Sequence, residues 1–150
     1  MRTSSIRRST TRKAAASPLY LDTSVALRAT LEQGTTPALE KRIAEAPLLV
    51  TSRLSLVESA RALHRLRMQD NVPEPRLADA RRELDALWNR CELWELSRGV
   101  CDLAALLAPD KLLRTLDALH LASFLLARAR LEGLELLTAD KRLEDAAGST

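Results

Sequence analysis

Glycine and aromatic residues are scarce in this sequence of 150 residues, which contains four glycines, two tryptophans, one tyrosine and one phenylalanine. Because alanine, leucine, arginine and glutamate are abundant instead, we expect helix to dominate the structure. Four aromatic side chains are too few for a platform on which nucleic-acid bases would stack. Hydrophobic residues make up 46% of the chain and charged residues 29%, a composition that is typical of a globular domain.

Only two cysteines are present, Cys91 and Cys101, and they do not form a Cys-x-x-Cys pair. Their apolar surroundings predict buried free thiols in a reducing compartment. No apolar run approaches the ~20 residues that a membrane-spanning helix needs. The N-terminus also lacks the hydrophobic segment of a secretory signal. We therefore expect a soluble, cytoplasmic protein without a membrane partner.

Acidic residues are missing from the first 17 positions, which contain four arginines and one lysine. The whole chain has a formal charge of +3, so residues 18–150 carry a charge of −2. We expect a disordered basic tail over residues 1–17 and one domain over residues 18–150, which is long enough to bury a hydrophobic core. The tail could hold phosphates, act as a transit-peptide-like segment or come from an upstream start codon.

Short apolar runs alternate with helical patterns along the rest of the chain. The predicted strands cover residues 19–22, 47–52, 92–96 and 134–139, and the predicted helices cover residues 23–32, 37–46, 53–68, 74–91, 99–108, 117–130 and 140–147. This alternation predicts an α/β fold with a parallel sheet that helices cover on both faces. In such sheets the ligand site lies beyond the carboxyl ends of the strands.

Four acidic residues occupy unusual positions. Asp22 and Asp140 follow the first and last predicted strands, whereas Glu58 and Asp117 lie within helical patterns. Asp22 and Asp140 could simply cap the helices that follow them, and Glu58 could pair with an arginine on its own helix. Asp117 is harder to explain in this way, because its helix is apolar nearly all round and has little polar face.

Taken together, the four acids predict a metal site. Two of them sit at strand ends on one edge of the sheet, and converging carboxylates repel one another unless a cation lies between them. Oxygen ligands without histidine or cysteine suit Mg²⁺ or Mn²⁺. These ions act on phosphates by polarising phosphoryl oxygens and lowering the pKa of an attacking water. His120, one helical turn after Asp117, could flank the same pocket or be a core residue whose hydrogen bonds are satisfied.

The stretches YLDTS, VESARAL, LRTLDALHLASF and LLTADKRLEDAA together resemble a PIN domain, and most closely the VapC-type ribonuclease toxins of prokaryotic type II toxin–antitoxin pairs. The resemblance covers about residues 18–147, and the long basic N-terminus is a departure from the family pattern. It implies a PIN-like three-layer α/β/α fold with a short, twisted, mostly parallel sheet of four or five strands. It also implies an Mg²⁺- or Mn²⁺-dependent endoribonuclease in which the metal-binding and catalytic acids are Asp22, Glu58, Asp117 and Asp140.

The resemblance further implies a set of supporting residues and partners. Hydroxyl groups with supporting parts near the metal would come from Thr23, Ser24, Thr115 and Thr138. Because the domain is slightly acidic, RNA must be held by local cations or by the tail, and the candidate cations are Arg53, Arg61, Arg114 and Lys141. The implied protein partners are a second copy of the chain and an antitoxin, whose C-terminal segment would occupy a groove among the helices predicted at 23–32, 37–46 and 53–68.

Two other functions fit the same residues. The chain could be a PIN-domain nuclease of ordinary RNA processing with no toxin role. It could also be a catalytically silent module whose acidic pocket binds a basic peptide. A silent module predicts that replacing Asp22 or Asp117 with asparagine leaves its function unchanged, whereas a nuclease would lose activity by orders of magnitude.

Overall fold

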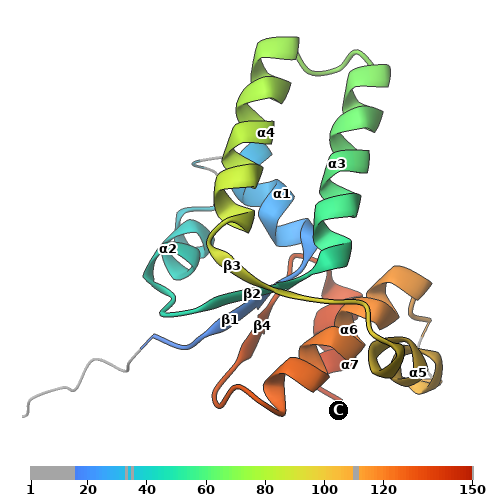
Figure 1. Ribbon diagram of the computed structural model, residues 1–150. Helices are drawn as coiled ribbons and strands as arrows, with labels where there is room; N and C mark the ends of the chain where they lie inside the picture. Colours follow the sequence, from blue (N-terminus) through green and yellow to red (C-terminus); the bar gives the residue numbers. More distant parts are fainter. Residues whose placement is uncertain (1–15, 33, 35, 110–111, 150) are drawn as a thin grey trace, which may run out of the picture.

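The structure, a computed structural model, describes residues 16–32, 34, 36–109 and 112–149, and these residues form four strands and seven helices (Figure 1). The strands are β1 (Leu19–Leu21), β2 (Leu49–Ser52), β3 (Cys91–Trp94) and β4 (Glu135–Leu137). The helices are α1 (Thr23–Leu31), α2 (Pro37–Glu45), α3 (Arg53–Met68), α4 (Glu74–Trp88), α5 (Arg98–Leu106), α6 (Thr115–Arg128) and α7 (Lys141–Ala147). All charged residues of the predicted tail lie outside the described residues, so the tail stays a prediction.

The four strands form one sheet in the order β3-β2-β1-β4, and every neighbouring pair is parallel. Tyr20 in the middle of β1 lies beside Val50 of β2 and Leu136 of β4. Parallel strands need crossover connections, and here two helices connect each strand to the next one along the chain. This arrangement confirms the predicted α/β fold with a short parallel sheet, and all four carboxyl ends lie at the same edge.

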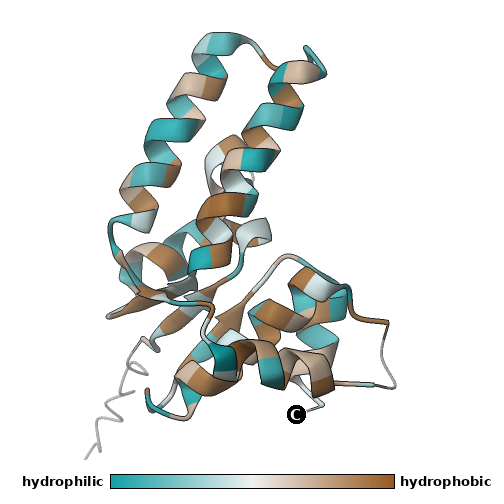
Figure 2. Ribbon diagram, turned by 45° about the vertical axis from the view of Figure 1, so that its right-hand side comes forward, coloured by the Kyte–Doolittle hydropathy of each residue, from teal (hydrophilic) through white to brown (hydrophobic). Residues whose placement is uncertain are grey.

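Helices cover both faces of the sheet and give the molecule three layers. Side chains alternate between the two faces along a strand, so Leu19 and Leu21 point to one face and Tyr20 to the other. The face of Leu19 and Leu21 packs against α1, α2, α3 and α4, and the face of Tyr20 packs against α6 and α7. In Figure 2 the helices carry hydrophobic and hydrophilic stripes on different sides, as a helix between core and solvent requires.

The long helices α3 and α4 pack against each other and project beyond the sheet as an antiparallel pair (Figure 1). The apolar stripe predicted for α4 is confirmed, because all of its members are buried: Leu77, Ala80, Leu84, Leu87 and Trp88. The indole nitrogen of Trp88 donates a hydrogen bond to the hydroxyl of Ser59 on α3 at 3.2 Å, which satisfies its polar atom inside the core.

The prediction of two buried thiols is wrong for Cys101, which is exposed on α5. This helix packs on α6 and buries only Val100 fully, and the next position along a helix points about 100° away. Cys91 is partly buried at the start of β3, and burial raises the pKa of its thiol to about 12. Within the described part of the chain, no helix is both long enough and apolar enough to cross a bilayer.

Candidate active site

Asp22 follows β1 directly and caps the N-terminus of α1. Its Oδ1 accepts a hydrogen bond from the backbone N–H of Val25 at 3.1 Å, and the Ser24 hydroxyl donates to the carboxylate at 2.8 Å. The hydroxyl of Thr138, which follows β4, donates to Oδ2 at 2.7 Å. Only 3% of Asp22 is exposed. Burial raises the pKa of Asp22, and the hydrogen bonds from Thr138, Ser24 and Val25 offset only part of that effect.

Glu58 lies in the middle of α3 and contacts residues of two other elements. Its Oε1 accepts a hydrogen bond from the Thr23 hydroxyl at 2.8 Å and lies 2.6 Å from Nε2 of His120 on α6. Burial alone would raise the pKa of Glu58, but the hydrogen bond and positive charge of His120 bring it below its usual value. The sequence also allowed Glu58 to pair with an arginine of its own helix. The structure pairs it with His120 on α6 instead, and the nearby positive charge of Arg65 also lowers the pKa of Glu58.

Asp117 lies in the first turn of α6, three residues before His120 and therefore on the same side of the helix. Its Oδ2 atom is buried and has no hydrogen-bond partner among the described residues. An isolated buried carboxylate oxygen is costly, so this atom needs a donor or a cation that the described protein residues do not supply. Asp117 as a whole residue is partly buried, so the expectation that its apolar helix leaves it little polar face toward water stays a prediction.

Asp140 caps the N-terminus of α7, which is the helix-capping role that the sequence also allowed. Its Oδ1 accepts a hydrogen bond from the backbone N–H of Arg142 at 2.9 Å, and its Oδ2 lies 3.5 Å from the guanidinium of the same residue. Burial would raise the pKa of Asp140, but these contacts with Arg142 lower it overall. The backbone N–H of Asp140 also donates to the Thr138 hydroxyl at 2.9 Å, which connects Asp140 to the Asp22 network.

The structure thus links three of the four acids in two adjacent networks, and Asp117 belongs to neither of them. One joins Asp22 to Asp140 through Thr138, and the other joins Glu58 to His120 through Thr23, the residue after Asp22. Among the described residues, no three aspartate, glutamate, histidine or cysteine side chains form a group that could hold a metal ion as they stand. The oxygen-only donor set and the unpartnered Asp117 oxygen nevertheless fit a hard divalent cation.

Three of the four predicted supporting hydroxyl residues contact the candidate acids. Thr23, Ser24 and Thr138 bind the acids directly, whereas Thr115 is exposed at the start of α6 and makes no hydrogen bond to the other candidates within the described residues.

Two of the candidate cations are already paired, Arg53 with Glu95 and Lys141 with Asp145. Arg61 and Arg114 are exposed and form no ion pair among the described residues. Sequence reasoning missed the part of Tyr20, and it left the part of His120 open.

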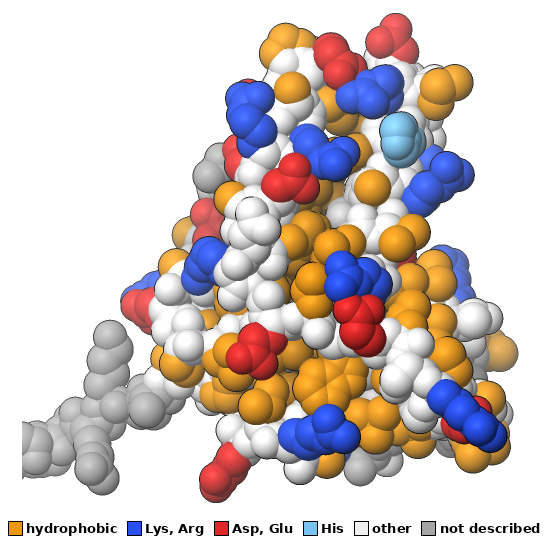
Figure 3. All heavy atoms as spheres, viewed as in Figure 1, with side chains coloured by type: hydrophobic (Ala, Val, Ile, Leu, Met, Phe, Trp, Pro, Cys, Tyr) orange, Lys and Arg blue, Asp and Glu red, His pale blue; other side chains and the backbone are white. Residues whose placement is uncertain are grey.

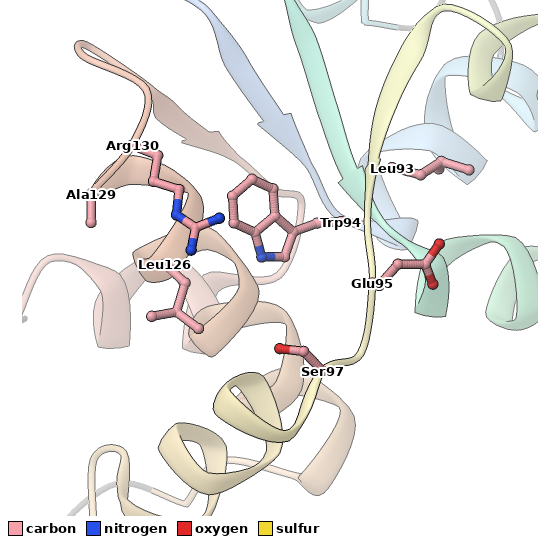
Figure 4. A pocket seen from close by; sticks show the side chains of 7 residues that line it. All are labelled: Leu93, Trp94, Glu95, Ser97, Leu126, Ala129 and Arg130. Atoms are coloured by element: carbon pink, nitrogen blue, oxygen red, sulfur yellow. The ribbon is translucent and has the colours of Figure 1, made fainter.

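A separate hollow of about 460 Å³ lies between the end of β3 and the C-terminal half of α6 (Figure 4). The Trp94 ring and the Arg130 guanidinium point toward each other across it, with the guanidinium carbon 5.5 Å from the ring centroid. Glu95 is the one carboxylate among the residues that line the hollow, and it pairs with Arg53. The hollow therefore offers no converging acids, and we do not assign the chemistry to it.

Three solved structures have the same fold. PAE2754 from Pyrobaculum aerophilum is 22% identical, with a TM-score of 0.59 over 95% of this chain and 88% of that chain. VapBC2 from Rickettsia felis, bound to a DNA fragment from their promoter, is 14% identical, with a TM-score of 0.57 over 82% and 99%. VapC20 from Mycobacterium tuberculosis, a Sarcin-Ricin loop cleaving toxin, is 14% identical, with a TM-score of 0.60 over 85% and 94%.

The family comparison covers almost the whole domain. Among curated proteins no sequence matches this chain. The model of the PIN domain, in contrast, matches residues 19–149, which include all four candidate acids and every strand and helix described above. The fold, the position of Asp22 and Asp140 after strand ends and this match agree with one another, and the chain belongs to the PIN domain family.

Proposed function

We propose that the protein is a metal-dependent endoribonuclease that hydrolyses RNA phosphodiester bonds with Mg²⁺ or Mn²⁺. The observation that carries this proposal is the buried carboxylate of Asp22 at the carboxyl end of β1, together with the buried Oδ2 of the partly buried Asp117 on α6, which has no partner among the described residues. A divalent cation would satisfy that oxygen and relieve the cost of burying Asp22. The all-oxygen donor set selects a hard ion over zinc or copper.

The four acids differ in how readily they could act as ligands of the ion. We rank Asp22 and Asp117 first, because hydrogen bonds fix the Asp22 carboxylate at the end of β1 and Asp117 has a buried oxygen without a partner among the described residues. Glu58 has one oxygen engaged by Thr23 and His120, and its other oxygen makes no hydrogen bond to the described residues. Asp140 must give up Arg142 to take part, so we rank it last. The chemistry that the ion supplies is polarisation of the phosphoryl group and a lower pKa for the attacking water.

Residues of the chain would orient the RNA around this centre. Ser24 and Thr138 hold the Asp22 carboxylate from two sides, so it is fixed before substrate arrives. RNA phosphates need cations that are not already paired, and Arg61, Arg65 and Arg114 meet this condition within the described residues. Figure 3 shows basic side chains and a histidine along the projecting α3 and α4, with acidic side chains between them.

Replacing Arg61 and Arg65 together with alanine should weaken RNA binding about 10-fold or more at low salt, because each lost phosphate contact reduces counterion release. The slope of log Kd against log salt should fall by about 1.5, at roughly 0.7 per contact with single-stranded RNA. The measurement is fluorescence anisotropy with labelled RNA and no divalent ion. The matched control replaces Arg53 and Lys141, which are paired with acids, and should change Kd less than threefold. Equal effects of the two double variants would contradict this assignment.

We further propose that the nuclease is the toxin of a type II pair, with an antitoxin and a second copy of the chain as its partners. The fold likeness to VapBC2 and to the VapC20 toxin supports this proposal. The antitoxin segment would lie among α1, α2 and α3, and a hollow where α3 meets α4, lined by Leu56, Leu63 and Trp88, offers apolar surface nearby. Expression without an antitoxin should arrest growth, whereas a housekeeping nuclease would leave growth unchanged.

The decisive experiment incubates purified protein with total RNA in Mg²⁺, in Mn²⁺ and in chelator. We expect cleavage only with a divalent ion, with products that carry 3′ hydroxyl and 5′ phosphate ends, which ligation-based end mapping would identify. Chelator removes the cation that the candidate carboxylates would hold, so the rate should fall to background. Cleavage that persists in chelator would refute the metal-dependent mechanism.

A further inference from the structure

The ring of His120 is fixed at both of its nitrogens. Nε2 lies 2.6 Å from Oε1 of Glu58, and Nδ1 lies 3.0 Å from the hydroxyl of Tyr20 on β1. Only 3% of His120 is exposed, and the Tyr20 ring meets it edge-on with centroids 6.2 Å apart. Three elements, α6, β1 and α3, therefore meet through one imidazole.

The direction of these hydrogen bonds follows from the chemistry of the partners. Glu58 is ionised at neutral pH and can only accept, so Nε2 must carry a proton and donate to Oε1. The Thr23 hydroxyl donates to the same oxygen, and it also lies 3.3 Å from Nε2. Both donors thus act on Oε1, while Oε2 makes no hydrogen bond to the described residues.

One oxygen of Glu58 is thus held by hydrogen bonds from the described residues and the other is not. We propose that His120 is a positioning residue, which together with Tyr20 fixes Oε1 of Glu58 and leaves Oε2 free to bind the cation. The inference rests on the proposed metal-dependent function. Glu58 reaches the site on a long side chain that would otherwise sample several rotamers, and 24% of its side chain remains exposed. Holding one oxygen from two rigid elements pre-orients the other, as outer hydrogen bonds do around metal ligands.

A merely structural histidine would share the burial and the hydrogen bonds, but not a coupling to metal affinity. We therefore propose Mn²⁺ titration of the full chain, followed by paramagnetic resonance of the free ion, at a temperature where circular dichroism shows each variant folded. His120→Ala should weaken Mn²⁺ binding about 10-fold, in the range typical of residues behind a metal ligand. His120→Gln, whose amide nitrogen can donate in place of Nε2, should restore most of the affinity. Tyr20→Phe should cost about two- to threefold.

Two comparisons make the test specific. His64→Ala, a change to an exposed histidine on α3, should leave Mn²⁺ affinity unchanged. Glu58→Gln should weaken binding by itself, and adding His120→Ala to it should have no further effect, because His120 acts through Glu58.

Each of the remaining outcomes overturns a defined part of the inference. Unchanged Mn²⁺ affinity in His120→Ala, with a lower melting temperature, would make His120 structural and leave the proposed function intact. Additive losses in the double variant would show that His120 does not act through Glu58. Failure of the wild-type protein to bind Mn²⁺ would overturn the proposed function and this inference together.

Discussion

Asparagine in place of Asp22 or Asp117 is expected to lower metal-dependent RNA cleavage by roughly 10³-fold or more, the scale of loss when a group at the reacting centre is removed. Asparagine keeps the shape of the side chain and can still accept a hydrogen bond, but it removes the charge that a divalent cation requires. The measurement is initial cleavage rate on a defined RNA with Mn²⁺. Asp145→Asn, which changes an exposed acid of α7, is the matched control and should retain full activity.

The same substitution at Asp22 should have the opposite effect on the metal-free fold. Burial raises the pKa of Asp22 in the folded chain, so the folded protein binds more protons than the unfolded chain above the unfolded value of about 3.9. Stability is therefore lost as pH rises from that value through the folded pKa. In chelator at pH 7, Asp22→Asn should melt a few degrees higher than the wild type, a gain of about 1 kcal/mol.

This stability difference should depend on both pH and metal. It should shrink as pH falls below about 4, because the wild-type carboxyl group is then neutral in both states. Saturating Mn²⁺ should raise the melting temperature of the wild type, by about 2.7 kcal/mol of stability at a concentration 100 times Kd, but should not do so for Asp22→Asn. An active Asp22→Asn variant would refute the metal site, and a variant that melts lower at pH 7 would refute the buried-charge argument.

Phe124→Ala should destabilise the protein by about 3–5 kcal/mol and lower its melting temperature by roughly 10 °C. Phe124 is 3% exposed on α6, packs edge-on against Tyr20 with centroids 5.9 Å apart, and carries the Arg128 guanidinium 5.1 Å from its ring. Alanine would leave a cavity between the sheet and α6. Circular dichroism during urea and thermal unfolding measures both quantities.

The functional effect of Phe124→Ala should follow from the position of its helix. Because α6 carries both Asp117 and His120, loosening this helix should also weaken Mn²⁺ binding below the melting temperature. Phe124→Leu refills most of the space and should cost only about 1 kcal/mol. Arg128→Ala removes the exposed cation over the ring and should cost less than about 1 kcal/mol. A loss from Arg128→Ala as large as that from Phe124→Ala would contradict the core-packing explanation.

The sequence pattern predicted the sheet and the positions of the acids because both depend on local order. A buried strand that ends in a carboxylate, as at Asp22, can be recognised from a few neighbouring residues. An acid on an apolar helix, such as Asp117, can be recognised in the same way. The pairing of Glu58 with His120 could not be predicted in this way, since 62 residues separate them and they lie on helices that cover opposite faces of the sheet. Ion pairs on the surface could not be predicted from the sequence either, because their partners can lie far apart in the chain. Arg53, for example, pairs with Glu95, 42 residues away.

The sheet order β3-β2-β1-β4 has a consequence for biosynthesis, because it seats the last strand beside the first. Thr138, the hydroxyl that braces Asp22, follows that last strand, so the two halves of the same carboxylate network are translated more than a hundred codons apart. A nascent chain that has not yet released residues 134–147 from the ribosome has an incomplete network, however well its earlier helices have formed. The proposed RNA cleavage would therefore begin only after translation of the domain is almost finished.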